Sequence, residues 1–147
     1  MLRISVEQAA KIRMYAEQAY PQECCGVLLG KLENGERFVR EAVPARNASP
    51  EMNTRYSIAP EDLIAVQKRA RDSQLDIIGF YHSHPNHPPQ WSSTDLMEAH
   101  WFACSYLILE VDKGRTGRML SFVLAGTSED DKRFDDEKLA IEDSATG

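Results

Sequence analysis

Cysteine is scarce in this chain. The sequence of 147 residues has three cysteines, at positions 24, 25 and 104, and two of them are adjacent. An odd number without framework spacing argues against a disulfide-stapled secreted domain and is typical of a reducing compartment, so we expect a cytoplasmic protein. Residues 1–5 also lack the apolar segment of a signal peptide. No apolar run approaches the roughly 20 residues that span a bilayer, so we expect no membrane partner.

Positive charge is scarce as well. Lysine and arginine number 17 against 23 aspartates and glutamates, which gives a formal net charge of −6. Without a basic block the chain is poorly suited to a phosphate backbone, so we expect no nucleic-acid partner. Acidic residues gather at 129–143, which predicts a solvated, partly ordered C-terminal tail over residues 129–147. Residues 1–128 contain no repeat or Gly/Ser linker and are expected to form one domain.

Hydrophobic spacing predicts a mixture of helices and strands. Three helices are expected: from the Ser5 cap to Pro21, over residues 60–73, and over residues 93–103. Strands are expected at residues 24–33, 36–43, 55–59, 76–82, 105–111 and 120–125. These elements follow no regular strand–helix–strand rhythm. We therefore predict an α/β sandwich with a mixed or largely antiparallel sheet covered by helices.

The most informative segment is residues 82–95, which begin His-Ser-His-Pro and end Ser-Ser-Thr-Asp. His82 and His84 follow an apolar run, and alternate positions of a strand point to one face. Asp95 falls in the first turn of a predicted helix, from which its carboxylate can reach back to the imidazoles. Two neutral imidazoles and a carboxylate form a ligand set of catalytic zinc, with a fourth position left for water. We therefore predict one Zn²⁺ per chain, bound by His82, His84 and Asp95.

Ser92 and Asp95 also fit an ordinary capping box, in which serine is the N-cap and an acid follows three residues later. Next to a His-x-His pair the ligand role of Asp95 is the favoured interpretation. The two roles are compatible, because a capped first turn is a rigid place for a metal ligand.

Hydrolysis at such a site needs a base that takes the proton of water and returns it to the leaving amine. Glu23 is favoured, because it stands just before the apolar run of residues 24–29, where partial desolvation raises the pKa of a carboxyl group. Glu98 and Glu110 remain alternatives. A nucleophilic Cys25 is disfavoured, since a buried free cysteine usually acts as a small apolar residue.

Four further residues near the motif have less specific roles. His87 lies in a proline-rich loop and is expected to face solvent or substrate rather than a metal. Trp91 fits a substrate groove and packing on the domain equally well. His100 is expected to be a packed or surface histidine, and Cys104 a core residue.

Glu23, His82-Ser83-His84-Pro85 and Ser92-Ser93-Thr94-Asp95 together resemble the motif of the JAMM (MPN+) metalloproteases, in their small prokaryotic branch. The resemblance covers roughly residues 1–125 and implies a three-layer α/β sandwich similar to that of cytidine deaminases. It also implies zinc on both histidines and Asp95, Glu23 as general base and acid, and Ser92 as a hydrogen-bond donor to the tetrahedral oxyanion.

The resemblance also implies a substrate. The segment between Pro85 and Ser93 is too short for the long insertions with which eukaryotic deubiquitinases grip ubiquitin. Small prokaryotic members of the family act on ubiquitin-like sulfur-carrier proteins that end in diglycine. They release the cysteine, peptide or conjugated partner attached after the second glycine. The alternatives are a non-catalytic MPN-type protein-binding module and a peptidase for another peptide. The oligomeric state, with a homodimer as one option, is left open.

Overall fold

The structure, a computed structural model, describes residues 1–143 of the chain. Its elements in chain order are β1 (Leu2–Ser5), α1 (Val6–Ala19), β2 (Cys25–Glu33), β3 (Glu36–Ala45), α2 (Pro60–Asp72), β4 (Asp76–Pro85), α3 (Ser93–Glu98), β5 (Ser105–Asp112), β6 (Arg115–Ala125), β7 (Arg133–Glu137) and β8 (Leu139–Glu142). No helix among residues 1–143 has both the length and the apolar character needed to cross a bilayer.

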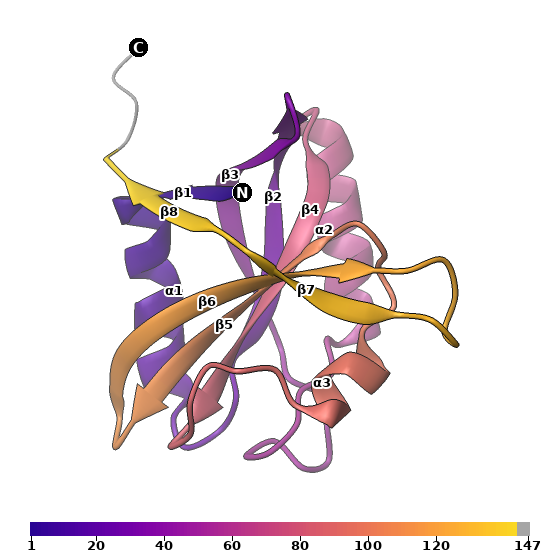
Figure 1. Ribbon diagram of the computed structural model, residues 1–147. Helices are drawn as coiled ribbons and strands as arrows, with labels where there is room; N and C mark the ends of the chain where they lie inside the picture. Colours follow the sequence, from indigo (N-terminus) through magenta and orange to yellow (C-terminus); the bar gives the residue numbers. More distant parts are fainter. Residues whose placement is uncertain (144–147) are drawn as a thin grey trace.

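One mixed sheet organises the described chain (Figure 1). Its strand order is β7-β6-β5-β4-β2-β3-β1-β8. The pairs β2–β3, β2–β4, β5–β6 and β6–β7 are antiparallel, whereas β4–β5, β1–β3 and β1–β8 are parallel. The predicted α/β fold with a mixed, mostly antiparallel sheet is confirmed. β4, the strand with the two histidines, lies inside the sheet between β2 and β5.

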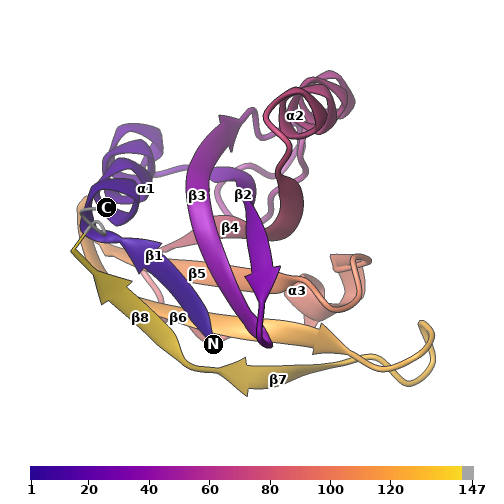
Figure 2. The same ribbon diagram turned by 90° about the horizontal axis from the view of Figure 1, so that it is seen from above.

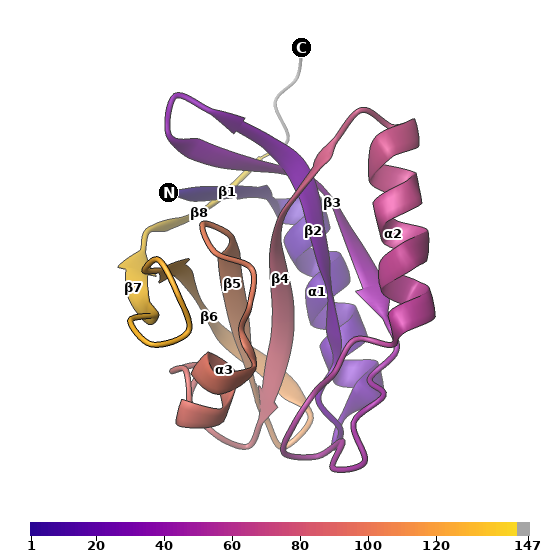
Figure 3. The ribbon, with the colours of Figure 1, turned by 90° about the vertical axis from the view of Figure 1, so that its right-hand side faces the viewer.

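Successive residues of the central strands enter two separate cores, because side chains alternate across a sheet. Tyr81 of β4 and Leu107 of β5 pack on the side of α1, with Ile12 of that helix. Phe80 and Ile108 pack on the other side, in the core that contains Val66 and Ala70 of α2. Figures 2 and 3 show the central strands between α1 and α2, with α3 near the end of β4. The layers are therefore helix, sheet and helices.

The predicted helix boundaries hold for α1 and α2 but not for α3. Ser5 caps α1 by accepting a hydrogen bond from the backbone amide of Gln8 at 3.1 Å. The third helix was predicted to run to residue 103, and this is wrong, because α3 ends at Glu98. Ala99 is extended and only 1% exposed. Burial of Ala99 in the core on the α2 side outweighs the helical tendency of the segment that follows.

The strand predicted at residues 55–59 is also wrong. Residues 46–59 form a loop with a single isolated bridge between Asn47 and Ile58. The Asn47 side chain organises this loop: its Oδ1 accepts hydrogen bonds from the backbone amides of Ser49 and Ser57 at 3.0 and 3.1 Å. An asparagine side chain that binds the backbone in this way replaces the hydrogen bonds of a sheet ladder.

The acidic segment expected as a solvated, partly ordered tail contributes two strands. β7 pairs with β6, and β8 pairs with β1 at the other end of the sheet order. Phe134 is 8% exposed in the core on the α2 side. Glu137 pairs with Arg37 at 2.9 Å and accepts hydrogen bonds from two serine hydroxyls. The acidic composition of this segment predicted a solvated tail because the buried contacts that order it come from residues far away in the sequence. Residues 144–147 of the expected tail lie outside the described part, and the boundary at residue 128 stays a prediction.

Candidate metal centre

Both histidines of the motif are on β4, and they are buried on the same face of the sheet. His82 is 1% exposed and His84 is 2% exposed. The strand extends to Pro85, so two-residue periodicity places both imidazoles on the face of Phe80, toward α2 and α3. The start of β2 lies beside them, because Cys25 is the sheet partner of His82. The predicted continuation of the strand to His84 is confirmed.

Three potential ligand atoms converge at the end of β4. The Nε2 atoms of His82 and His84 are 3.2 Å apart. Asp95 places its two carboxylate oxygens 3.3 Å from Nε2 of His82 and 3.0 Å from Nε2 of His84. Ligands bound about 2.0–2.1 Å from a tetrahedral zinc ion stand roughly 3.3 Å apart, so these donors fit zinc in number, type and spacing.

Hydrogen bonding explains why Nε2 of His84 is available to a metal. Its Nδ1 lies 2.8 Å from the carbonyl oxygen of Pro88. A carbonyl can only accept, so Nδ1 carries the proton and Nε2 presents its lone pair. Nδ1 of His82 is buried without a hydrogen-bond partner among the described residues. The His82 ring is instead stacked against Tyr56, with centroids 4.3 Å apart.

Asp95 forms the predicted capping box, and its position leaves the predicted ligand role open to it. Its backbone amide donates to Oγ of Ser92 at 3.0 Å, and its carboxylate accepts from the backbone amide of Ser92 at 2.9 Å. The same carboxylate faces both histidines. Burial raises the pKa of the Asp95 carboxyl, but the close contacts with the His82 and His84 imidazoles and the hydrogen bond from the Ser92 backbone amide outweigh burial and hold that pKa well below its usual value. The Asp95 carboxylate is therefore charged and oriented toward both histidines, as a metal ligand at this place would need to be.

Glu23 precedes β2 and is 3% exposed. Its Oε1 has no hydrogen-bond partner among the described residues. Burial, with smaller contributions from the charges of Asp95 and Glu98, raises the pKa of Glu23 to about 8. The backbone is held by the loop of residues 46–59, since Glu23 N donates to Met52 O at 2.7 Å and its carbonyl accepts from Asn47 at 3.1 Å. This buried carboxyl has the desolvation expected of a general base near neutral pH.

The other acidic candidates have partners of their own. Glu98, at the end of α3, pairs with Arg55 at 3.5 Å and is 40% exposed. Glu110, on β5, pairs with Arg118 at 3.3 Å. Ser92 is exposed, and its hydroxyl accepts from Asp95 while donating to no described residue. That hydroxyl therefore has a proton available for a further hydrogen bond.

Comparison with known proteins assigns the chain to a family. The family described as prokaryotic homologs of the JAB domain matches residues 5–125. The chain belongs to this family. The resemblance to the JAMM (MPN+) metalloproteases is thereby confirmed, and the chain is a JAMM-type hydrolase.

Individual relatives of this JAB-domain chain agree with the family assignment. The desampylase of Haloferax volcanii is 36% identical over 106 residues, which cover 72% of each protein. A probable TtuB-protein conjugate cleaving protease of Thermus thermophilus is 33% identical over 78 residues, 53% of this chain and 52% of that protein. The chain thus spans about half the length of the Thermus relative.

Solved structures share the fold along almost the whole chain. A protein of Desulfitobacterium hafniense, 26% identical, superposes with a TM-score of 0.81 over 98% of this chain and 96% of that one. A protein of Salinibacter ruber, 32% identical, superposes with a TM-score of 0.74 over 98% and 93% of the two chains.

The remaining predicted residues surround the centre of this JAB domain. The ring centroids of His87 and His84 are 4.4 Å apart. Partial burial lowers the pKa of His87. Trp91 packs on Phe134 at 5.6 Å between ring centroids, which agrees with a packing role. His100 lies on the surface, with its Nδ1 2.8 Å from Glu129.

The cysteines behave as core residues. Cys24, Cys25 and Cys104 are free and buried. Burial raises the pKa of Cys25 to about 12, so it stays a thiol at neutral pH. This agrees with the interpretation that disfavoured a cysteine nucleophile.

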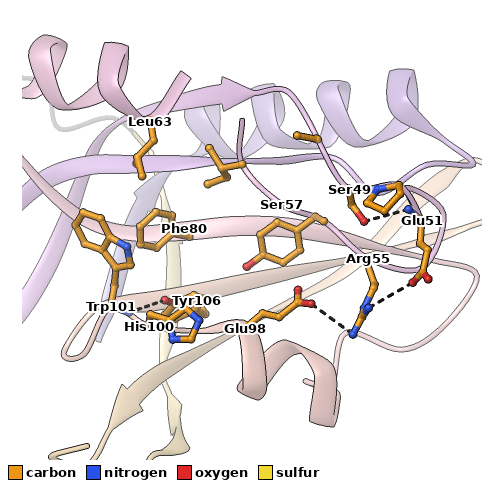
Figure 4. Close-up of a pocket in the computed structure, with 14 residues that line it drawn as sticks. Ser49, Glu51, Arg55, Ser57, Leu63, Phe80, Glu98, His100, Trp101 and Tyr106 are labelled. Atoms are coloured by element: carbon orange, nitrogen blue, oxygen red, sulfur yellow. Dashed lines mark hydrogen bonds and ion pairs between the residues drawn. The ribbon is translucent and has the colours of Figure 1, made fainter. Parts of the chain in front are cut away.

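A pocket of about 460 Å³ opens beside the candidate metal centre on the α2 side of the JAB domain. Its walls include residues 48–51 and 55–58, Phe80, Trp101 and Tyr106, and Figure 4 shows Arg55 reaching toward both Glu51 and Glu98 at one end. The lining also includes Tyr56, the residue stacked on His82. Sequence analysis missed the contribution of this loop, because it carries no motif and owes its position to Asn47.

Proposed function

We propose that this chain is a zinc-dependent isopeptidase that hydrolyses the bond after the C-terminal diglycine of a ubiquitin-like sulfur-carrier protein. The observation that carries the proposal is the convergence of His82, His84 and Asp95 beside the buried carboxyl of Glu23. The family assignment and the names of two relatives support the reaction class.

His82 and His84 would hold the zinc ion through Nε2, and Asp95 through its carboxylate. Zinc bound there would supply Lewis acidity, lowering the pKa of a coordinated water toward about 7 and polarising the substrate carbonyl. The three side chains contribute one negative charge, so a net positive charge would remain at the centre. Burial of both histidines excludes bulk water from this point and strengthens its electrostatic effect on a substrate.

Glu23 would take the proton from the attacking water and return it to the leaving amine. A base works best when its pKa lies near the working pH, and the raised pKa of Glu23 meets that condition. Its unpaired Oε1 is free to accept the proton. The Ser92 hydroxyl would donate a hydrogen bond to the oxyanion that develops on the substrate carbonyl. The capping box fixes Ser92 and Asp95 relative to each other.

The relatives and the pocket support the proposed substrate class. One relative is named for desampylation and the other for cleavage of TtuB conjugates, and we extend the substrate class, a ubiquitin-like protein conjugate, to this chain. Two glycines have no side chains, so they can bring the scissile bond close to the buried histidines. The pocket beside Tyr56 offers space for the preceding part of the carrier tail. The product beyond the diglycine would be cysteine, a peptide or a conjugated partner.

We also propose that the reaction takes place in the reducing cytoplasm. The three cysteines are free and buried in the described structure, and no pair of them forms a disulfide. A fold that needs no disulfide suits that compartment.

Intact-mass spectrometry of a diglycine-ended carrier protein tests the proposal. The substrate bears one extra cysteine or a short peptide after the second glycine and is incubated with the zinc-loaded protein, with Glu23→Ala as the inactive control. We expect loss of the extension with the wild type alone, and no loss in the presence of a chelator.

The same experiment separates the alternatives. If the zinc-loaded protein leaves every carrier intact, the result excludes the carrier as substrate but not the zinc site. Unrelated peptides would then be tested as substrates. A protein that binds the carrier and cleaves nothing would support a non-catalytic MPN-type module.

A further inference from the structure

Helix α3 carries the candidate metal ligand Asp95 and contacts the apolar core through the partly buried Leu96 and through its buried C-cap residue Ala99. It has 6 residues, and none of them is fully buried. A helix this short is not stable by itself, because helices under about 12 residues are marginal in water. The capping box of Ser92 and Asp95 satisfies its N-terminal end. The polar contacts at its C-terminal end therefore add to the packing of Leu96 and Ala99 in keeping Asp95 in place.

Lys132 occupies that C-terminal end. Its ammonium group donates hydrogen bonds to the carbonyl oxygens of Met97 and Ala99, both at 2.9 Å. The last carbonyls of a helix have no partner within the helix, and a cation near them is favourable. The Lys132 side chain is only 8% exposed, although it comes from the turn between β6 and β7, far along the chain.

The turn that presents Lys132 is itself well ordered. Asp131 accepts hydrogen bonds from the backbone amides of Thr127 and Ser128 at 2.9 and 2.7 Å. Glu129 pairs with Lys132 at 2.5 Å and with His100 at 2.8 Å, which attaches the turn to the segment after α3. Lys132 therefore connects a fixed turn to the helix that holds Asp95.

We propose that Lys132 is a positioning residue of the metal centre: it fixes the C-terminal end of α3 and thereby the position of Asp95. This inference rests on the proposed role of Asp95 as a metal ligand. Removal of the ammonium group leaves the carbonyls of Met97 and Ala99 without their partner. The last turn of α3 then opens, and the Asp95 carboxylate is no longer held opposite His82 and His84. Residues that orient metal ligands in this way typically change metal affinity about 10- to 100-fold when replaced.

The test is the zinc affinity of Lys132→Met, measured by competition with a chromogenic chelator at 25 °C on folded protein. We expect the dissociation constant to rise about 10-fold. Lys132→Arg keeps a cation and donors at the same place and is expected to retain most of the affinity. If Lys132→Met does not fold, Lys132→Gln, which retains an amide donor, is measured instead.

Two matched variants isolate the contact. Lys138→Met removes an exposed lysine of the same segment, and Glu129→Gln removes the ion pair of Lys132 while leaving both carbonyl hydrogen bonds. Both are expected to bind zinc within about twofold of the wild type. Amide hydrogen exchange gives a readout without metal: the amides of Leu96 and Ala99, bonded to Ser92 O and Leu96 O, should exchange faster in Lys132→Met.

An unchanged zinc affinity in Lys132→Met, or an equal loss in Lys138→Met, would overturn the role of Lys132. A wild-type chain with no zinc affinity would overturn the metal centre and this inference with it. A zinc-binding wild type with an unaffected Lys132→Met would overturn the inference alone, so the two failures are distinguishable.

Discussion

The phenol ring of Tyr56 lies nearly parallel to the imidazole of His82, with centroids 4.3 Å apart and planes inclined by 21°. Nδ1 of His82 has no hydrogen-bond partner among the described residues, so packing replaces the usual orienting contact of a metal-binding histidine. Tyr56 belongs to the loop that also holds the backbone of Glu23 through Asn47. One loop therefore orients both a candidate metal ligand and the candidate base.

Truncation of Tyr56 is expected to weaken the metal centre. Tyr56→Ala removes the ring that fixes His82 and should raise the zinc dissociation constant about 10-fold. Tyr56→Phe keeps the ring and should bind zinc like the wild type. Chelator competition measures both, and similar losses in the two variants would show that the hydroxyl, not the stacked ring, is the important group.

Replacement of Glu23 is expected to separate catalysis from metal binding. Glu23→Gln should lower kcat by about 10²–10⁴ while the zinc content stays the same, because Glu23 is outside the ligand cluster. Glu110→Gln, whose side chain pairs with Arg118, should keep its activity. Metal analysis and steady-state kinetics on the same preparations check both, and an active Glu23→Gln would move the role of base to another residue.

Substitutions of Ser92 and Asp95 are expected to have different effects on zinc binding and activity. Asp95→Ala should lose zinc and activity together, because it removes a ligand. Ser92→Ala should keep zinc, lose about 1 kcal/mol of stability with its cap, and lower kcat about 10²–10³ through the missing oxyanion donor. Ser93→Ala, at the exposed neighbouring position, serves as the control. A Ser92→Ala protein with unchanged kcat and a reduced melting temperature would assign to Ser92 a capping role alone.

The raised pKa of Glu23 predicts a pH-dependent stability of the metal-free protein. The folded state binds this proton more tightly than the unfolded chain, because the pKa rises from 4.5 to about 8. The resulting stabilisation is complete below pH 4.5 and is lost as the pH rises through about 8. Glu23→Gln lacks this titration. Its free energy of unfolding should therefore equal that of the wild type at low pH and exceed it by about 2–4 kcal/mol above pH 8.

Denaturant unfolding in the presence of a chelator, at several pH values, measures this difference. The difference between the free energies of unfolding of the two proteins cancels the contribution of every other titrating group whose pKa is the same in both. A difference that stays constant between acid and alkaline pH would show that Glu23 is not desolvated in the folded protein.

The ordered C-terminal strands predict that Phe134 matters for stability. Phe134 is buried against Tyr106 and Phe122, with ring centroids 5.3 and 6.1 Å away. Phe134→Ala should therefore lower the free energy of unfolding by about 3 kcal/mol. Asp136→Ala, at an exposed position of the same strand, should change it by less than about 0.5 kcal/mol. If urea titrations show equally small changes in the free energy of unfolding for both variants, the segment is a loosely attached tail, as its charge suggested.

Local spacing determined much of the candidate site. A two-residue repeat in an apolar strand is enough to place His82 and His84 on one face, and a serine with an acid three residues later is enough to start a helix with Asp95 in its first turn. Glu23 was favoured by its place before an apolar strand, which accounts for its desolvation, although Glu98 and Glu110 remained alternatives until the resemblance to the family pointed to Glu23. These features depend on neighbours in the sequence, so periodicity and capping rules reveal them.

Long-range pairing decided the rest. Only the alignment of β2 with β4 places Glu23 near the histidines, and only the fold brings Tyr56 onto His82 and Lys132 onto the end of α3. The same is true of β7 and β8, in a segment where charge suggested a solvated tail. Such contacts join residues far apart in the chain, and their energy comes from burial and hydrogen bonds that exist only after folding. The sequence by itself therefore determined which chemical groups are present and how each is locally presented, whereas the tertiary structure decided which loops and strands hold them in place.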